Sequence, residues 1–153
     1  MKRLAIRAAR AAAAFVCGGI AFARWVCFTQ KSAFPWAASG TALGASRAQL
    51  AGSWGGPVRS TSEAFAEVTD EAWNFTAGPW QFHVFFRDQA AVLILAFRNS
   101  AMPRVERTAA LAAMGGPGWK LAAKGIWKRP AGETAIQLSD KSMRFAAAGF
   151  VNA

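Results

Sequence analysis

Residues with nucleophilic or metal-binding side chains are scarce in this chain of 153 residues. It has no tyrosine, one histidine and two cysteines, and both cysteines lie within the first 27 residues. The rest of the chain therefore has no disulfide and no thiolate metal site. A single histidine, His83, excludes a two-histidine metal spacing, and the sequence has neither a Gly-x-Ser-x-Gly elbow nor a glycine-rich phosphate loop. The sequence predicts a protein without enzymatic activity, cofactor or metal, with His83 as a structural residue of an aromatic strand.

Acidic residues are also few: there are 8, against 18 basic residues, giving a net charge of +10 and a pI near 11.1. Six basic residues lie in the first 40 positions, where no acid occurs; they are Lys2, Arg3, Arg7, Arg10, Arg24 and Lys31. Residues 41–153 have a net charge of only +4. A basic pI is typical of nucleic-acid-binding domains. Because most of the excess belongs to the N-terminal segment, nucleic acid is the least favoured partner.

The N-terminal segment, up to residue 40, has the composition of a signal peptide followed by a flexible lead-in. A basic start precedes the apolar run 11–23, which is 13 residues long and too short to span a bilayer. The Ala-Phe-Ala sequence at 21–23 has the form expected before a cleavage site. Cleavage near Ala37 or Ala38 and retention as a membrane anchor are alternatives, and lipidation at Cys17 is disfavoured because no small residue precedes it. We expect export to the periplasm or cell envelope.

A compact helix signal occupies residues 44–57. Ser46 is a suitable N-cap, because its hydroxyl can accept a hydrogen bond from an unpaired N–H of the first turn. Leu50 and Trp54 are four residues apart and fall on one helix face. The Gly-Gly-Pro sequence at 55–57 ends a helix, because glycine adopts left-handed backbone angles and proline cannot continue the helix. The spacing predicts a helix of two turns from residue 47 to residue 54.

This segment resembles the opening motif of the SmpA/OmlA (BamE-like) envelope domains, Gly-x-Thr-x-x-Gln-Val, four residues, then Gly-x-Pro. The matching positions are Gly44, Ser46, Gln49, Leu50, Gly55 and Pro57. Trp73 and Phe75 follow where that family has a Trp-x-Tyr strand. The resemblance extends to about Phe97. It implies a small α+β domain of the bacterial envelope with a role in envelope assembly or maintenance.

The middle of the chain changes to a period of two. Residues 80–87 alternate between apolar and mostly polar side chains, Asp88 and Gln89 follow as a turn, and 91–97 is continuously apolar. This pattern is typical of a β-hairpin whose return strand is buried on most sides. The stretch 58–71, which precedes the hairpin, holds four of the eight acids and is predicted to be a solvated acidic loop or short helix.

The last third of the chain predicts a second helix and three strands. Pro103 can open the helix, and a second Gly-Gly-Pro at 115–117 stops it. The expected elements are a helix at 104–114 and strands at 119–127, 134–139 and 142–146, with a turn-rich basic loop at 128–133. The predicted fold is therefore α+β, with short helices packed on one face of an antiparallel sheet in a single domain at 41–153.

The repeated Gly-Gly-Pro raises the possibility of two similar helix-hairpin halves. Leu50 lies five residues before Gly55, whereas Leu111 lies four before Gly115, so the registers differ and chance is favoured. A true duplication would resemble the arrangement of secreted β-lactamase-inhibitor proteins, whose concave sheet grips a partner enzyme.

Tryptophans and cations are interleaved near residue 125. The candidate partner-binding residues are Trp119, Lys120, Lys124, Trp127, Lys128 and Arg129. Such a group can line a protein interface, where tryptophan and arginine are enriched, or bind single-stranded nucleic acid by stacking. Strand alternation alone also produces it, with indoles in the core and cations in solvent.

These observations together predict a non-enzymatic exported envelope protein that acts as a protein-interaction or assembly module. The expected partner is another envelope protein, and membrane association through the N-terminal segment is a further expectation. A secreted inhibitor-like binder is the main alternative, and a basic nucleic-acid-binding domain is the lesser one.

Overall fold

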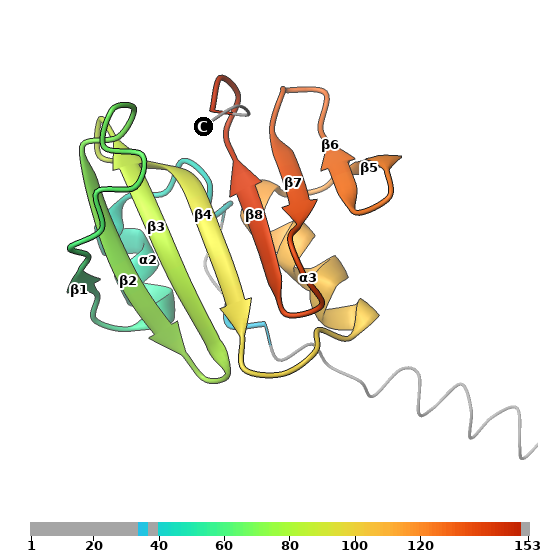
Figure 1. The fold of residues 1–153 in the computed structure, drawn as a ribbon, viewed down its shortest axis with the longest axis horizontal. Helices are drawn as coiled ribbons and strands as arrows, with labels where there is room; N and C mark the ends of the chain where they lie inside the picture. Colours follow the sequence, from blue (N-terminus) through green and yellow to red (C-terminus); the bar gives the residue numbers. More distant parts are fainter. Residues whose placement is uncertain (1–33, 37–39, 151–153) are drawn as a thin grey trace, which may run out of the picture. The chain divides into compact units, whose positions relative to one another are not determined.

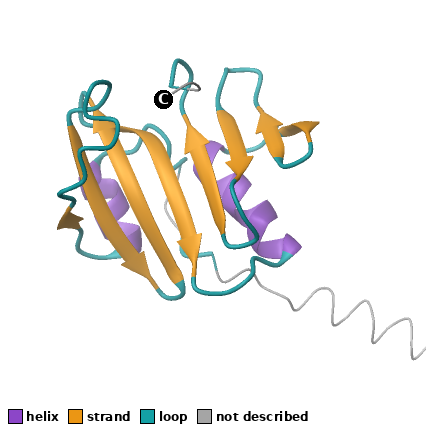
Figure 2. Ribbon diagram, in the orientation of Figure 1, coloured by secondary structure: helices purple, strands orange, loops and turns teal. Residues whose placement is uncertain are grey.

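An eight-stranded antiparallel sheet with two helices packed against one of its faces forms the fold (Figures 1 and 2). The computed structural model describes residues 34–36 and 40–150. The helices are α2 (Arg47–Trp54) and α3 (Arg104–Gly115). The predicted α+β class and antiparallel sheet are confirmed. The predicted signal segment and its cleavage sites lie at least partly outside the described residues, and within these residues no helix has the length and apolarity needed to cross a bilayer.

The sheet consists of two four-stranded meanders that meet at their last strands. The strands are β1 (Val58–Arg59), β2 (Glu71–Ala77), β3 (Trp80–Arg87), β4 (Ala90–Arg98), β5 (Lys120–Ala123), β6 (Ile126–Lys128), β7 (Thr134–Gln137) and β8 (Ser142–Ala146). Their order across the sheet is β1-β2-β3-β4-β8-β7-β6-β5. Each meander follows a helix, α2 or α3, and β4 pairs with β8 at the centre. The order is thus helix and four strands, twice, where the sequence predicted a helix and a hairpin, then a helix, a hairpin and one further strand.

Helix α2 begins and ends as its sequence predicts. The Ser46 hydroxyl accepts from the Gln49 backbone N–H at 3.3 Å, and the Gln49 side-chain oxygen accepts from the Ser46 N–H at 2.8 Å. These two bonds form a capping box, which satisfies two otherwise unpaired donors. At the other end Gly55 has φ +86°, and its N–H donates to the Ala51 carbonyl at 2.9 Å. The helix therefore stops at Trp54.

The β3–β4 hairpin also forms as predicted. Asp88 and Gln89 both have positive φ, 50° and 65°, as required at the two central positions of a type I′ turn. The Asp88 N–H donates to the Asp70 carboxylate at 2.7 Å. This bond ties the turn to the acidic stretch before β2, which forms turns in the structure and not a helix.

The prediction of a single strand at 119–127 is wrong. The structure has two short antiparallel strands there, β5 and β6, with Lys120 opposite Lys128. The chain reverses at Lys124 and Gly125, and Gly125 has φ +73°, a conformation that glycine adopts without steric cost. The reversal adds a strand to the second meander, and β1 is a further short strand that the sequence did not predict.

The main core lies between the sheet and the helices and is largely aromatic. Trp54 of α2 stacks on Phe82 of β3, with ring centroids 4.0 Å apart and planes 9° apart. Phe34 packs edge-on against Trp80 at 5.0 Å, and Trp36 lies 5.5 Å from Trp54. Residues 34–36, which the sequence assigns to the flexible lead-in, therefore contribute side chains to the core.

Candidate interaction surface

The face of the sheet opposite the helices carries a row of partly exposed side chains. Register places five residues directly side by side on five strands; they are His83, Leu95, Arg144, Ile136 and Ile126. Neighbouring residues in the same strands, such as Val84, Ile94 and Phe145, belong to the core beneath the helices. Since successive side chains of a strand point to opposite faces, the row points away from the helices. We call the surface around this row the open face.

The open face is mainly apolar at its centre. Leu95, Ile136 and Ile126 are partly exposed there, whereas Val84 and Ile94 on the other side are fully buried. Phe97 lies beside the row, and its ring meets the His83 ring edge-on at 5.3 Å. Among residues 34–36 and 40–150, helices pack on one side of the sheet only, and the other side remains a partly apolar, partly accessible surface.

One end of the open face is covered by loops. Phe85, Leu93 and Ala146 are buried in a second cluster on this side, under Phe65 and Phe150. The Phe65 ring stands edge-on to Phe85 at 5.0 Å. Leu95 of the row also packs against this second cluster, so the accessible part of the face runs from His83 towards β6.

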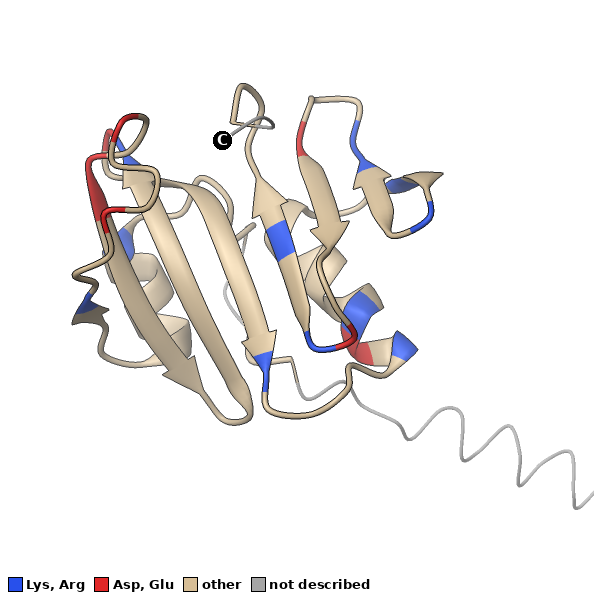
Figure 3. Ribbon diagram, in the orientation of Figure 1, with Lys and Arg blue, Asp and Glu red and all other residues tan. Residues whose placement is uncertain are grey.

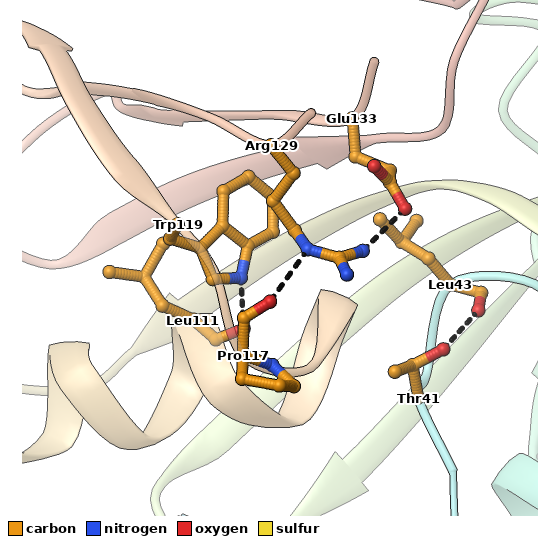
Figure 4. A network of polar contacts seen from close by, with 7 residues as sticks. All are labelled: Thr41, Leu43, Leu111, Pro117, Trp119, Arg129 and Glu133. Atoms are coloured by element: carbon orange, nitrogen blue, oxygen red, sulfur yellow. Dashed lines mark hydrogen bonds and ion pairs between the residues drawn. The ribbon is translucent and has the colours of Figure 1, made fainter. Parts of the chain in front are cut away.

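The two predicted indoles lie on the helix side of the sheet. The Trp119 Nε1–H donates to the Leu111 carbonyl of α3 at 2.6 Å (Figure 4). Trp127 packs against the main core, and the Arg107 guanidinium lies 5.9 Å from its ring centroid. Both indoles therefore hold α3 to the sheet, as simple alternation in the strand would give.

Arg129 also makes contacts within the fold. Its Nε donates to the Pro117 carbonyl at 3.0 Å, and its Nη1 pairs with the Glu133 carboxylate at 2.6 Å (Figure 4). The guanidinium is 5.9 Å from the Trp119 ring centroid. These contacts clamp the start of the β6–β7 loop onto the link between α3 and β5.

The three predicted lysines differ from Arg129. Lys120, Lys124 and Lys128 are exposed, and within the described part of the chain none of them has a hydrogen bond or an ion pair. Lys120 and Lys128 stand directly opposite each other in β5 and β6. Because Trp119 and Trp127 point to the helix side, both lysines point to the open face. The structure thus separates the six predicted residues into three structural ones and three free cations.

Charge is distributed unevenly over the sheet (Figure 3). The six strands from β3 to β8 contain no acidic residue and five basic ones, Arg87, Arg98, Lys120, Lys128 and Arg144. Five of the eight acidic residues gather at the other end, in and before β2 and at the β3–β4 turn; they are Glu63, Glu67, Asp70, Glu71 and Asp88. The other three, Glu106, Glu133 and Asp140, lie in α3 and in the loops on either side of β7. The accessible part of the open face is therefore positive along one side.

Other parts of the described chain offer less to a ligand. No group of three or more His, Cys, Asp or Glu side chains able to hold a metal is found among residues 34–36 and 40–150. A hollow of about 380 Å³ lies beside α2. The Arg47 guanidinium at its wall pairs with Glu71 at 3.5 Å and lies 4.3 Å from the Trp73 ring centroid. Its charge is already engaged within the fold.

Sequence reasoning missed the row on the open face as a candidate site. It predicted 91–97 as a strand buried on most sides, whereas Leu95 and Phe97 remain partly exposed. The sequence contained one signal. The strand β4 is apolar on both of its faces, and such a strand indicates that both faces of the sheet contact other groups.

Comparisons of the chain with models of known protein families, with characterised proteins and with solved structures gave no match.

Proposed function

We propose that this chain is a non-enzymatic interaction module that binds another protein through the open face of its sheet. The observation that carries the proposal is the asymmetry of the sheet: two helices cover one face, and the other leaves Leu95, Ile136 and Ile126 partly exposed. Apolar surface of this kind on a rigid element is typical of binding sites, because its removal from water favours association.

The charge of the surface indicates an acidic partner. Strands β3 to β8 have basic residues and no acids, and interfaces pair surfaces of opposite sign. The chain's own N-terminal segment does not supply such an occupant, because its first 40 residues contain six basic side chains and no acid. The proposed partner is therefore a separate molecule with acidic side chains.

The envelope is the proposed location. The support comes from the basic and apolar N-terminal segment with its Ala-Phe-Ala sequence at 21–23, and from the SmpA/OmlA-like spacing of residues 44–57. In this setting the partner is another exported or envelope protein, and the role by resemblance is assembly or maintenance.

A secreted inhibitor-like binder is the second candidate, and the sheet order favours it. Each half has a helix followed by a four-stranded meander, and the halves meet at β4 and β8. Two similar halves that present one continuous sheet to a partner would give this strand order, and this supports the candidate. An assembly factor should fractionate with membranes, whereas an inhibitor should appear in the soluble periplasm or the medium.

The nucleic-acid alternative has less support. Binding of single strands usually combines cations with aromatic rings on which bases stack. Trp119 and Trp127, the rings proposed for that purpose, pack against α3 and the core.

The test is a capture experiment with matched variants. The tagged full chain is cross-linked in cells, retained proteins are identified, and the affinity of each purified candidate is measured. Leu95→Arg places a charge at the centre of the open face and should abolish binding. Leu121→Arg is the control, because Leu121 is 65% exposed but lies opposite Trp127, on the other side of the sheet. Equal binding by both variants would refute the proposal.

A further inference from the structure

The lysine pair of the β5–β6 hairpin defines the partner more closely. Resting on the proposed function, we infer that Lys120 and Lys128 bind a run of carboxylates in an acidic polypeptide whose apolar side chain contacts the centre of the open face. Both lysines are exposed and point to the same side as Ile126 and Ile136.

The first argument is the repulsion within the pair. Lys120 and Lys128 stand directly opposite each other, and like charges in that relation destabilise a sheet. Lys124, in the turn of the same hairpin, adds a third positive charge. A bound carboxylate between the two ammonium groups would turn this repulsion into attraction.

The second argument is that neither lysine takes part in an ion pair within the described part of the chain. Glu133, the acid nearest in sequence, already pairs with Arg129 at 2.6 Å. A second ion pair joins Arg47 and Glu71, on the helix side of the sheet. Arginines close to an acid are thus engaged, while the hairpin lysines remain available to an external partner.

The sheet sets the spacing of the partner's groups. Strands β4, β8, β7 and β6 are neighbours, so Leu95 and Ile126 are separated by three inter-strand distances, about 14 Å at about 4.8 Å each. Lys128 lies two residues further along β6, which makes its separation from Leu95 about 16 Å. An extended chain advances about 3.3 Å per residue. A segment that crosses the strands would carry its carboxylates about five residues from its apolar side chain.

The surface between these points favours polypeptide over phosphate polymers. Ile136 and Ile126 lie between Leu95 and Lys128, together with Arg144. The two isoleucines offer contact to the apolar side chains of a polypeptide, which a phosphate backbone lacks. The acids around β2 and the β3–β4 turn would in addition repel a long anion that extended along the whole sheet.

The experiment uses the full chain and a fluorescent probe peptide with a Leu-Phe pair, four small polar residues and four glutamates. Binding is followed by anisotropy at low and at physiological salt. The double variant Lys120→Glu/Lys128→Glu should lose about tenfold or more in affinity, and Lys141→Glu, an exposed lysine in the β7–β8 turn, should change it by less than about twofold. The double variant should instead prefer a probe in which lysines replace the glutamates.

The double variant is also designed to leave the stability of the fold unchanged. It replaces a lysine pair by a glutamate pair, so the repulsion remains and Tm should stay close to that of the parent. The single variant Lys120→Glu creates an opposite-charge pair, which should raise Tm slightly while it weakens binding of the acidic probe. A marked fall in Tm for either variant would show that the lysines are structural and would overturn the inference.

The remaining outcomes separate the two proposals. If Leu95→Arg abolishes binding of a captured partner but the lysine variants do not, the open face is the site and the acidic recognition is wrong. If the lysine variants alone matter and Leu95→Arg binds normally, the apolar centre of the open face is not the binding site and the proposed function is wrong. Failure of the parent chain to bind the acidic probe, or tighter binding of a 20-nucleotide oligothymidine or of phosphatidylglycerol vesicles, would also overturn the inference.

Discussion

The covered face and the open face of the sheet are made by the same strands but have different tasks. On the covered side Trp54, Phe82 and Phe145 are at most 1% exposed and pack in aromatic contact with the helices or in the main core. On the open side, Leu95 and Ile136 lie in strands of the same sheet but point to its opposite face, and they remain partly exposed. Neighbouring residues of one strand therefore differ in role: one side chain stabilises the core, and the next belongs to the proposed binding surface.

The largest difference in stability between the two faces is expected from Trp54→Ala. Trp54 is 1% exposed and stacks on Phe82, so the free energy of unfolding should fall by about 3–5 kcal/mol. Leu95→Ser on the open face should cost about 1 kcal/mol or less, since its side chain is only partly buried. Urea denaturation measures both, and equal losses would contradict the distinction between the faces.

Removal of the aromatic pair at the N-terminal side is expected to rank second. A chain that starts at residue 39 lacks Phe34 and Trp36, which contact Trp80 and Trp54. It should lose about 3 kcal/mol of stability, whereas a chain that starts at residue 24 should not.

The two starts correspond to the two cleavage sites considered for export. Mass analysis of the mature N-terminus should therefore find cleavage upstream of Phe34. Equal melting temperatures for the two shortened chains would show that residues 34–36 do not support the core.

Gly115→Ala tests the packing of α3 on the covered face. A Cβ at this position would lie 2.6 Å from the Trp119 ring, so the indole that bonds Leu111 must move, at a cost of about 2 kcal/mol. Gly52→Ala in α2 is the matched control, because nothing lies within 4 Å of its Cβ position. That change should raise stability by up to about 1 kcal/mol, and thermal melting distinguishes the two signs.

The smallest expected effect compares an engaged cation with a free one. Arg129→Met removes the bonds to Pro117 and Glu133 and should cost about 1 kcal/mol. Lys128→Met removes no bond and should change the free energy of unfolding by less than about 0.5 kcal/mol. If Lys128→Met proves as costly as Arg129→Met, the lysine is part of the fold.

Local signals in the sequence predicted the elements that depend on neighbours in the chain. Ser46 and Gln49 with the following glycines gave the bounds of α2, and the alternation in β3 gave its hairpin. The reversal at Gly125 was missed because Lys124-Gly125 is a weak turn signal. The order of the strands, and hence which of Leu95 and Ile94 meets a helix, depends on contacts remote in sequence, so periodicity alone does not determine it.

The junction of the two meanders has a consequence for the newly made chain. Most strands pair with a partner close in sequence, but β4 and β8 join residues as distant as Leu93 and Ala146. Pairing of this kind forms slowly, because a long loop must close first. Until β8 has been synthesised, the apolar strand β4 is an unpaired sheet edge, and such an edge is a template for aggregation. We therefore expect the growing chain to be most dependent on chaperones after β4 has emerged and before β8 arrives.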